Sequence, residues 1–234
     1  MKNGKCTAIV LAAGHGKRMG GSVQKQFMDL KGKPLVYYAL HCFQQSPLID
    51  EIILVTGKEQ ISYCTSKIVE TYGFTKVKTV VPGGSERYDS VYEGLKACRN
   101  TEYVMIHDGA RPFITEELLE RGYEAVQKYG TAIAGVPSKD TVKIVDEGQN
   151  VIETPVRSSV WLVQTPQIFG YQQIRGAYDR LQKLDKTGIT DDAMVMEKLG
   201  NQRVHMFPGD YTNIKITTPD DLEVAEQFLK PKKF

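Results

Sequence analysis

Thr7-Ala-Ile-Val-Leu-Ala-Ala-Gly-His-Gly-Lys-Arg-Met19 joins a short apolar run to a glycine-rich run, and this joint decides the fold. A short apolar run of this kind fits a strand that is buried on both faces. Gly14 and Gly16 open turn conformations that are closed to other residues, and small residues let backbone N–H groups approach an anion. Lys17 and Arg18 add positive charge beside them. The stretch therefore predicts a buried first strand that leads into a loop for a polyphosphate or a base.

Further apolar runs alternate with amphipathic stretches along the chain. Strand-like runs occupy residues 52–56, 77–81, 103–107 and 131–136, and helical stretches begin near residues 34, 88, 115 and 218. Thr115 and Thr218 are expected to cap their helices. The predicted buried stripe of the first helix consists of Leu35, Tyr38, Ala39, Cys42 and Phe43. The alternation predicts an α/β protein, Rossmann-like with three α/β/α layers and a mostly parallel sheet, in a single domain over residues 1–234.

Residues 138–160 break this alternation. Thr-Val-Lys-Ile-Val (141–145) and Val-Ile-Glu-Thr (151–154) flank the polar run Asp-Glu-Gly-Gln-Asn, which predicts a β-hairpin that protrudes from the sheet. A hairpin cannot bury both of its faces alone. We therefore expect this β-arm, residues 138–160, to pack on a second copy of the chain and form a homodimer.

Composition and charge exclude several classes of protein. The 234 residues include 30 Lys and Arg against 28 Asp and Glu, a net charge of +2, so neither nucleic acid nor a membrane is an expected partner. The cysteines lie far apart with no Cys-x-x-Cys pair, which argues against disulfide-stapled and zinc-ribbon folds; they are Cys6, Cys42, Cys64 and Cys98. Neither a secretory leader nor a membrane-length apolar run is recognisable, so a cytoplasmic protein is expected.

The glycine-rich run by itself leaves its function open. The dinucleotide-binding fingerprint fails because the third glycine falls at Gly20 rather than three residues after Gly16. The P-loop pattern fails because no Gly-Lys-Ser/Thr ends the run. A phosphate-binding loop and a solvated glycine turn with scattered basic residues both remain compatible with these residues.

Ordered motifs along the whole chain shift this balance. Leu-Ala-Ala-Gly-x-Gly-x-Arg-Met (11–19) resembles the signature loop of the sugar-nucleotide pyrophosphorylase and nucleotidyltransferase superfamily. More narrowly, the chain resembles the 2-C-methyl-D-erythritol 4-phosphate cytidylyltransferase family between residues 8 and 228. The matching motifs are Lys-Gln-Phe (25–27), Gly-Gly-x-Glu-Arg (83–87), Asp-Ser-Val (89–91), His-Asp-Gly-Ala-Arg-Pro (107–112), Asp-Thr-Val-Lys (140–143), Gln-Thr-Pro-Gln-Ile-Phe (164–169), Ile-Thr-Asp-Asp-Ala (189–193) and Asn-Ile-Lys-Ile-Thr-Thr-Pro (213–219).

The resemblance implies an enzyme that transfers CMP from CTP to 2-C-methyl-D-erythritol 4-phosphate, releases pyrophosphate and uses Mg²⁺ or another divalent cation. In that family the reaction belongs to the non-mevalonate pathway of isoprene biosynthesis. The nearest alternative is a cytidylyltransferase for another polyol phosphate, such as ribitol 5-phosphate. A nicotinamide-dependent dehydrogenase is a distant alternative, which the glycine spacing opposes. A catalytically silent nucleotide-binding regulator is another, which the retained charged residues oppose.

The resemblance also assigns roles to individual residues. The catalytic set is Arg18, Lys25, Arg157 and Lys215, and within it Arg18 and Lys25 stabilise the charge of the transition state. The CTP-binding set is Ala12, Ala13, Gly14, Gly16, Gly84, Arg87 and Ser90. The polyol phosphate set is Asp108, Arg111, Thr141, Arg157, Thr165, Thr190 and Lys215, with Asp108 also as the metal ligand. Ser85 stands where many family members carry Asp, so a side-chain contact at that position stays open.

Several of these positions have a second interpretation from the residues alone. Thr190 precedes two aspartates and would suit a helix N-cap, and Thr141 would suit the surface of the arm. Arg157 follows the predicted hairpin, so we expect it to reach the active site of the partner subunit. Lys215 lies between two isoleucines and needs an anion nearby, whereas His107 at the end of an apolar strand is expected to be structural.

Overall fold

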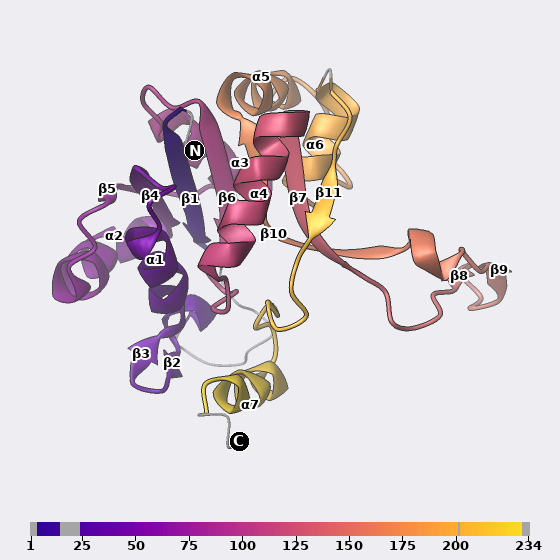
Figure 1. The fold of residues 1–234 in the computed structure, drawn as a ribbon, viewed down its shortest axis with the longest axis horizontal. Coiled ribbons are helices and arrows are strands. Elements are labelled where there is room, and N and C mark those ends of the chain that lie inside the picture. Colours follow the sequence, from indigo (N-terminus) through magenta and orange to yellow (C-terminus); the bar gives the residue numbers. More distant parts are fainter. Residues whose placement is uncertain (1–3, 15–23, 201, 231–234) are drawn as a thin grey trace.

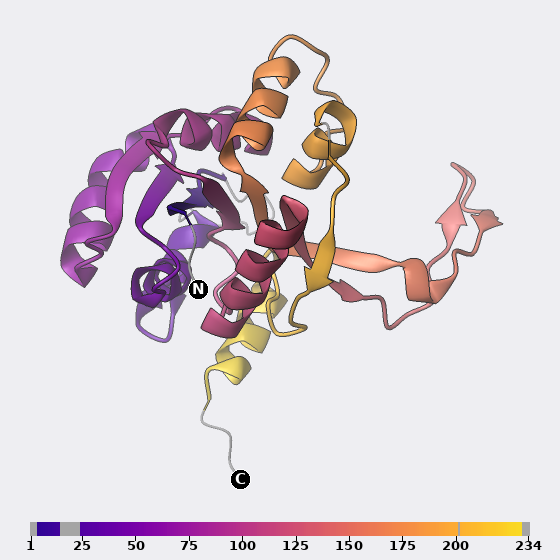
Figure 2. The same ribbon diagram turned by 45° about the horizontal axis from the view of Figure 1, so that its top comes forward.

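The computed structural model describes residues 4–14, 24–200 and 202–230, which build one central sheet with helices on both of its faces (Figures 1 and 2). The sheet has seven strands, in the order β11 (Met206–Pro208), β7 (Thr131–Pro137), β10 (Trp161–Gly170), β6 (Tyr103–Asp108), β1 (Cys6–Ala12), β4 (Glu51–Thr56) and β5 (Val77–Pro82). Neighbouring strands are parallel except β10, which runs antiparallel to both β6 and β7. The prediction of a mostly parallel α/β sheet is confirmed.

Helices cover each face of this sheet. One face carries α1 (Leu35–Gln45), α4 (Glu116–Tyr129) and a helical segment made of η3 (Lys58–Gln60), α2 (Ile61–Tyr63) and η4 (Cys64–Glu70). The other face carries α3 (Arg87–Ala97), α5 (Tyr171–Leu181) and α6 (Asp192–Leu199). Outside the layers lie η2 (Lys25–Phe27), the β2 (Asp29–Leu30) and β3 (Lys33–Pro34) ladder, η5 (Arg157–Ser159) and α7 (Pro219–Phe228). In the described part of the chain, none of these helices has both the length and the apolarity needed to cross a membrane.

The side chains of β1 explain why both faces of the sheet need cover. Ala8 and Val10 pack in the apolar cluster that includes α1 and α4, whereas Ile9 packs in the cluster on the opposite face. Residues two apart in a strand share a face. A continuous apolar run therefore requires helices on both sides, and every residue from Cys6 to Val10 is completely buried.

The buried face of α1 differs from the predicted stripe. Leu35, Ala39 and Phe43 are buried as expected, but the rest of the buried face consists of Val36 and Leu40. Tyr38 and Cys42 are only partly buried, and each packs against the edge of an apolar cluster. Tyr38 turns toward the neighbouring β2, where its hydroxyl donates to the carbonyl oxygen of Leu30 at 2.5 Å.

Helix caps fix the ends of two helices, as the sequence predicts. α4 begins behind Thr115 and α7 behind Thr218, and each threonine hydroxyl accepts a hydrogen bond from a backbone N–H of its helix. At α7 the carboxylate of Asp221 accepts the Thr218 N–H in return, at 2.9 Å, which completes a capping box. Ala225 of α7 packs in the same apolar cluster as Ile216. The cap and this contact together hold the segment that leads into α7.

The arm extends away from the three layers (Figures 1 and 2). It contains a short antiparallel ladder of β8 (Ile144–Val145) with β9 (Val151–Glu153), within the two runs that the sequence predicts as strands. Its apolar side chains are between 44% and 72% exposed; they are Ile144, Val145, Val151, Ile152 and Val156. No other element of the described chain covers them, so the arm presents an apolar surface on a hairpin that has little support of its own.

Candidate active site

A pocket of about 450 Å³ opens at the carboxyl ends of β1 and β6. Its walls are the loop after β1, η2, the loop between β5 and α3, the end of β6 and the segment before α7. Eight of the predicted site residues line it: Ala13, Gly14, Lys25, Gly84, Arg87, Ser90, Asp108 and Lys215. Open α/β sheets bind their ligands at the carboxyl ends of the strands, so this pocket is the candidate active site.

Glycines let two walls of the pocket meet. A Cβ on Gly83 would lie 2.6 Å from the Cβ of Ala13, and a Cβ on Gly84 would lie 2.3 Å from the Cβ of Asp89. Both distances are too short for real carbon atoms, so side chains at these positions would force the walls apart. A Cβ on Gly14, in contrast, would meet no described atom within 4 Å. Gly83 and Gly84 are needed for packing, whereas Gly14 keeps space open in the pocket itself.

The start of α3 is held against this wall by hydroxyl groups. The Ser90 hydroxyl accepts a hydrogen bond from the Gly84 N–H and donates to the carbonyl oxygen of Glu86, both at 3.2 Å. The Ser85 hydroxyl donates to the carboxylate of Asp89 at 2.9 Å. Ser85 therefore has a side-chain contact at the start of its own helix.

Lys25 is placed in the pocket wall by its neighbour Gln26. The Gln26 side chain is buried, and its amide donates to the carbonyl oxygen of Ala12 at 2.6 Å. This bond fixes η2 against the end of β1, where Ala12 is buried behind the wall. Lys25 thereby lines the same pocket as Lys215, although the two residues are far apart in sequence.

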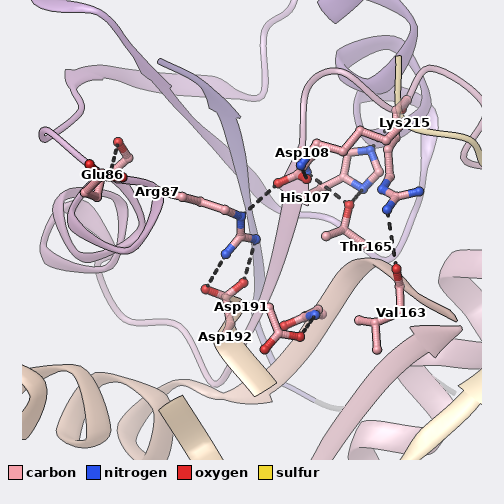
Figure 3. Close-up of polar contacts among 12 residues, drawn as sticks. Glu86, Arg87, His107, Asp108, Val163, Thr165, Asp191, Asp192 and Lys215 are labelled. Carbon is pink, nitrogen blue, oxygen red and sulfur yellow. Dashed lines mark hydrogen bonds and ion pairs between the residues drawn. The ribbon is translucent and has the colours of Figure 1, made fainter. Parts of the chain in front are cut away.

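A chain of alternating charges crosses the pocket (Figure 3). One carboxylate oxygen of Asp108 accepts a hydrogen bond from Arg87 Nε at 3.1 Å, and the other pairs with Lys215 Nζ at 2.6 Å. The other two nitrogens of Arg87 fork onto the carboxylate of Asp192, at 3.0 and 2.8 Å. The Tyr178 hydroxyl donates to that carboxylate at 2.6 Å. Every charge in this chain has an opposite charge beside it.

These contacts set the charge states of the side chains. Burial alone would raise the pKa of Asp108, but Arg87 and Lys215 hold it well below its usual range, so this carboxylate stays ionised. Burial alone would lower the pKa of Arg87, but Asp192 and Asp108 raise it well above its usual value. For Arg111 burial has the larger effect, and its pKa is lowered.

His107 and Thr165 support Asp108 from behind (Figure 3). Burial lowers the pKa of His107 to about 4, so the ring is neutral near pH 7. Its Nε2 lies 3.0 Å from the carbonyl oxygen of Arg111, and its Nδ1 lies 3.0 Å from the Thr165 hydroxyl. A carbonyl oxygen only accepts, so we assign the proton to Nε2, and Nδ1 then accepts from the Thr165 hydroxyl. That hydroxyl accepts the Asp108 N–H at 3.1 Å, which fixes the backbone of the aspartate.

Lys215 and Arg111 are positioned by the segment before α7. Ile216 is buried, and its N–H donates to the carbonyl oxygen of Ala110 at 2.9 Å, which leaves the preceding Lys215 in the pocket wall. Arg111 Nη1 donates to the carbonyl oxygen of Asn213 at 2.7 Å. Arg111 Nε is buried and has no hydrogen-bond partner among the described residues. An unpaired buried donor is unfavourable, so this group is a candidate to bind an anion.

Some predicted site residues are not in the pocket. Gly16 and Arg18 lie outside the described residues. Thr141 and Arg157 are exposed on the arm. The guanidinium of Arg157 makes no hydrogen bond or ion pair with any residue that the structure describes. The two arm residues therefore remain without a binding site in a single subunit.

Thr190 is exposed immediately before α6 and does not line the pocket. The interpretation of Thr190 as a helix cap was wrong. The cap is the next residue, Asp191, whose carboxylate accepts the Met194 N–H at 2.9 Å. A carboxylate is at least as good an N-cap as a threonine hydroxyl. Of the neighbouring candidates Thr190 and Asp191, the helix begins behind Asp191.

Asp192 and Tyr178 were not among the site residues that the sequence motifs indicated. Asp192 belongs to the Ile-Thr-Asp-Asp-Ala motif (189–193), from which only Thr190 was assigned a role. The pair of aspartates was a weak signal, because one of them is enough to cap a helix and an acidic residue in the first turn is common in any case. Nothing in the sequence indicates that this second carboxylate is completely buried, or that it faces Arg87.

The pocket fits a metal ion that brings most of its own ligands. In the described parts of the chain, no group of three or more His, Cys, Asp or Glu side chains is arranged to hold a metal. Asp108 and Glu86 are the carboxylates among the described lining residues. Each oxygen of Asp108 accepts one contact and keeps a further lone pair. Mg²⁺ is commonly bound by one or two carboxylates, with phosphate oxygens and water completing its shell, so this donor set suits Mg²⁺ bound to a triphosphate.

Comparisons with known proteins agree on one family. The sequence profile of 2-C-methyl-D-erythritol 4-phosphate cytidylyltransferase matches residues 6–231. Relatives of that name from Lachnoclostridium phytofermentans and Clostridium botulinum are 49% and 48% identical, and each alignment covers 97% of this chain and 97% or 98% of the relative. The crystal structure of 4-diphosphocytidyl-2C-methyl-D-erythritol synthase from Anaerococcus prevotii superposes with a TM-score of 0.85 at 34% identity, over 97% of this chain and 99% of that one. A Francisella tularensis structure of the family gives a TM-score of 0.80 at 29% identity, over 96% and 100%.

Proposed function

Because the chain belongs to the 2-C-methyl-D-erythritol 4-phosphate cytidylyltransferase family, we infer that it transfers CMP from CTP to 2-C-methyl-D-erythritol 4-phosphate. It is a nucleotidyltransferase of isoprenoid biosynthesis, and pyrophosphate is the second product. The observation that supports this function beyond the family match is the pocket itself. Two lysines from distant parts of the chain and one ionised aspartate meet there at the carboxyl ends of the strands.

The reaction forms and breaks one P–O bond at the same phosphorus atom. An oxygen of the methylerythritol phosphate attacks the α-phosphorus of CTP. The bond from that phosphorus to the oxygen bridging to the β-phosphate breaks, and pyrophosphate leaves with the electron pair. Both reactants are anions, so their repulsion is the first obstacle. One cation about 4 Å from a phosphate charge offsets about 4 kcal/mol at an effective dielectric constant of 20, so a few cations are enough.

We assign the cations and walls of the pocket to the two substrates. Lys25 and Lys215 hold the reacting phosphates and stabilise the charge of the pentavalent transition state, together with Arg18. CTP lies against the wall formed by Ala13, Gly14, Gly84 and Ser90 and against the segment around Ala12 and Gly16. Arg111 contributes its unpaired Nε–H to the polyol phosphate side, and Thr165 keeps Asp108 in place.

We also propose that the enzyme uses Mg²⁺, held by Asp108 and by oxygens of the triphosphate. When bound, the ion would neutralise part of the triphosphate charge and orient the α-phosphate. On the protein side, Arg87 and Lys215 keep the Asp108 carboxylate ionised and therefore ready to bind a cation.

The working enzyme is proposed to be a homodimer joined through the arm. The arm exposes apolar side chains that a second subunit would cover, and it carries Thr141 and Arg157. The exposed Arg157 and Thr141 of one subunit would complete the polyol phosphate site of the other. Four free cysteines and the use of CTP fit a cytoplasmic enzyme.

The proposed function is tested by pyrophosphate release from CTP in the presence of Mg²⁺. Three arms contain 2-C-methyl-D-erythritol 4-phosphate, ribitol 5-phosphate, or no acceptor. We expect release with the first acceptor, and a kcat/KM at least about 100-fold lower with the second, since it presents different hydroxyl groups to the site. Preference for ribitol 5-phosphate would replace the substrate assignment, and absence of release in every arm would favour a silent nucleotide-binding regulator.

A further inference from the structure

Two buried groups beside the pocket have no role in the proposed reaction. They are the carboxylate of Asp192, at the start of α6, and the hydroxyl of Tyr178, in α5, and both residues are completely buried. The hydroxyl donates to the carboxylate at 2.6 Å. The same carboxylate receives the forked nitrogens of Arg87 (Figure 3). A carboxylate without access to water needs partners of this kind.

The arrangement contributes geometry more than stability. Removing a carboxylate and a guanidinium from water is unfavourable, and their attraction roughly offsets that loss, so a well-packed apolar pair would hold α6 to the molecule as well. A forked ion pair does something that an apolar contact does not do. Its two parallel hydrogen bonds fix both the distance and the plane of the Arg87 guanidinium.

The position of this guanidinium determines where the Asp108 carboxylate lies. Arg87 Nε belongs to the same rigid plane as the two forked nitrogens, and it donates to Asp108 at 3.1 Å. The other oxygen of Asp108 lies 2.6 Å from Lys215 Nζ. The backbone of Asp108 is held separately by Thr165. Arg87 thus links the buried carboxylate of Asp192 to the carboxylate of Asp108, which lines the pocket.

We propose that Asp192, supported by Tyr178, is a positioning residue that acts through Arg87 to orient the Asp108 carboxylate beside Lys215. This rests on the proposed function, in which Asp108 and Lys215 act on the substrates. The role of the Arg87 guanidinium is then to orient Asp108, and toward CTP the residue only lines the pocket. The helix pair α5 and α6, which does not line the pocket with described residues, becomes part of the catalytic apparatus.

Two substitutions weaken the contact of Asp192 with Arg87 to different degrees. Asp192→Asn keeps the shape of the side chain but removes one of the two carboxylates that face Arg87. The guanidinium would then turn toward Asp108 and draw its carboxylate away from Lys215. Tyr178→Phe removes a single hydrogen bond to Asp192 and leaves every charge in place. It should therefore disturb both the fold and the position of Arg87 less than Asp192→Asn does.

The chain contains a matched control for these variants. In a second Tyr–Asp–Arg set, the Tyr92 hydroxyl donates to Asp179 at 2.8 Å, and Arg175 Nε donates to the same oxygen at 3.0 Å. This set joins α3 to α5, as the first joins α3, α5 and α6, but in the described part of the chain it makes no hydrogen bond or ion pair with Asp108 or with another residue that lines the pocket. Tyr92 also stacks on Tyr178 with ring centroids 6.4 Å apart, and Asp179 is half exposed and receives one nitrogen of Arg175 rather than two. Asp179→Asn therefore disturbs the packing beside Tyr178 while it leaves the fork between Asp192 and Arg87 in place.

The test measures kcat, the KM for each substrate, the dissociation constant for CTP and the thermal midpoint of each variant. We expect kcat to fall by about 10- to 100-fold in Asp192→Asn and about 3- to 10-fold in Tyr178→Phe, because small displacements of a catalytic group are costly. CTP affinity should change by less than about threefold, since the wall formed by Gly84 and Ser90 remains. Asp179→Asn should keep the kcat of the unchanged enzyme.

A double-mutant cycle separates positioning from simple loss of structure. If Asp192 acts through Arg87, then Asp192→Asn should lower kcat by less than about twofold in an Arg87→Lys background, because the fork is already lost. An additive effect in that background would overturn the proposal. So would variants whose thermal midpoints fall while kcat per folded molecule stays the same. Failure of the unchanged enzyme to release pyrophosphate would instead refute the proposed function, so the two failures are distinguishable.

Discussion

The pocket and the arm are built in opposite ways. In the pocket, charged side chains from β6, α3, α6 and the segment before α7 satisfy one another: Asp108 has two cationic partners, and Arg87 has two carboxylates. On the arm, apolar side chains are exposed, and the Arg157 guanidinium has no partner among the described residues. The pocket is thus specified by contacts within one chain, whereas the arm carries groups that no contact within the described chain satisfies, which is why we propose that a second subunit uses them.

The largest effect is expected from the pocket cations. Lys215→Ala should lower kcat roughly 10²–10³-fold, as for the loss of one preorganised donor to developing charge, and Lys25→Ala should do the same. Steady-state kinetics with saturating CTP would measure this. The control is Lys31→Ala, which removes an exposed lysine 3.7 Å from Glu226 and should leave kcat unchanged. Near-normal turnover of Lys25→Ala would remove that lysine from the mechanism.

The next prediction joins the two regions. Arg157→Ala should lower activity by about 10- to 100-fold if the guanidinium binds the phosphate in the partner's pocket, because charge-assisted contacts are among the strong ones. Mixing Arg157→Ala subunits with Lys215→Ala subunits should restore activity to about a quarter of that of the enzyme without substitutions. About half of the dimers would then be mixed, with one intact site each. A mixture with no more activity than its components would show that Arg157 does not act across subunits.

A smaller effect is expected from the apolar surface of the arm alone. Ile152→Asp places a charge on a side chain that is 67% exposed in the single subunit, and it should weaken the dimer about 30-fold, as for an interface position worth about 2 kcal/mol. Deletion of residues 143–153 should yield monomers. Molecular mass measured in solution over a range of concentrations tests both. Leu184→Asp changes an equally apolar residue, 54% exposed and away from the arm, and should remain dimeric. A fully dimeric deletion variant would contradict the proposed role of the arm.

The smallest effect concerns space within the pocket. Gly14→Ala adds a methyl group that meets no described protein atom, so stability should not change. It should raise the KM for CTP roughly tenfold if the ligand occupies that space, because overpacking costs about 1–3 kcal/mol. The control is Gly176→Ala, whose Cβ would lie 3.6 Å from Arg180 Nη1. It should neither lower the stability of the protein nor raise the KM for CTP. An unchanged KM for Gly14→Ala would place CTP elsewhere.

The framework of the fold could be predicted well from the amino-acid sequence, and its details less well. Apolar runs such as residues 7–12 form central strands of the sheet. A strand that is apolar at nearly every position must be covered on both faces, and only the interior of a sheet between helical layers provides this. The predicted stripe on α1 lacked the buried Val36 and Leu40, and it did not show that Tyr38 stays partly exposed, because its hydroxyl bonds to a carbonyl oxygen on β2, a neighbour that helical periodicity does not reveal. The cap of α6 was misjudged by one residue, because Thr190 and Asp191 are both good N-caps and only the backbone path selects between them.

The sequence by itself determined the class of this protein: the order of its strands and helices, a glycine-lined loop after the first strand, the separated basic residues, and motifs that identify a cytidylyltransferase family. Those features are local, and they depend on periodicity, turn chemistry and residue type. Only the tertiary structure decided that Lys25 and Lys215 share a pocket, and that Asp108 is tied through Arg87 to the buried Asp192. The direction of a side chain and its burial depend on how distant segments pack, and the spacing of residues along the chain does not encode that.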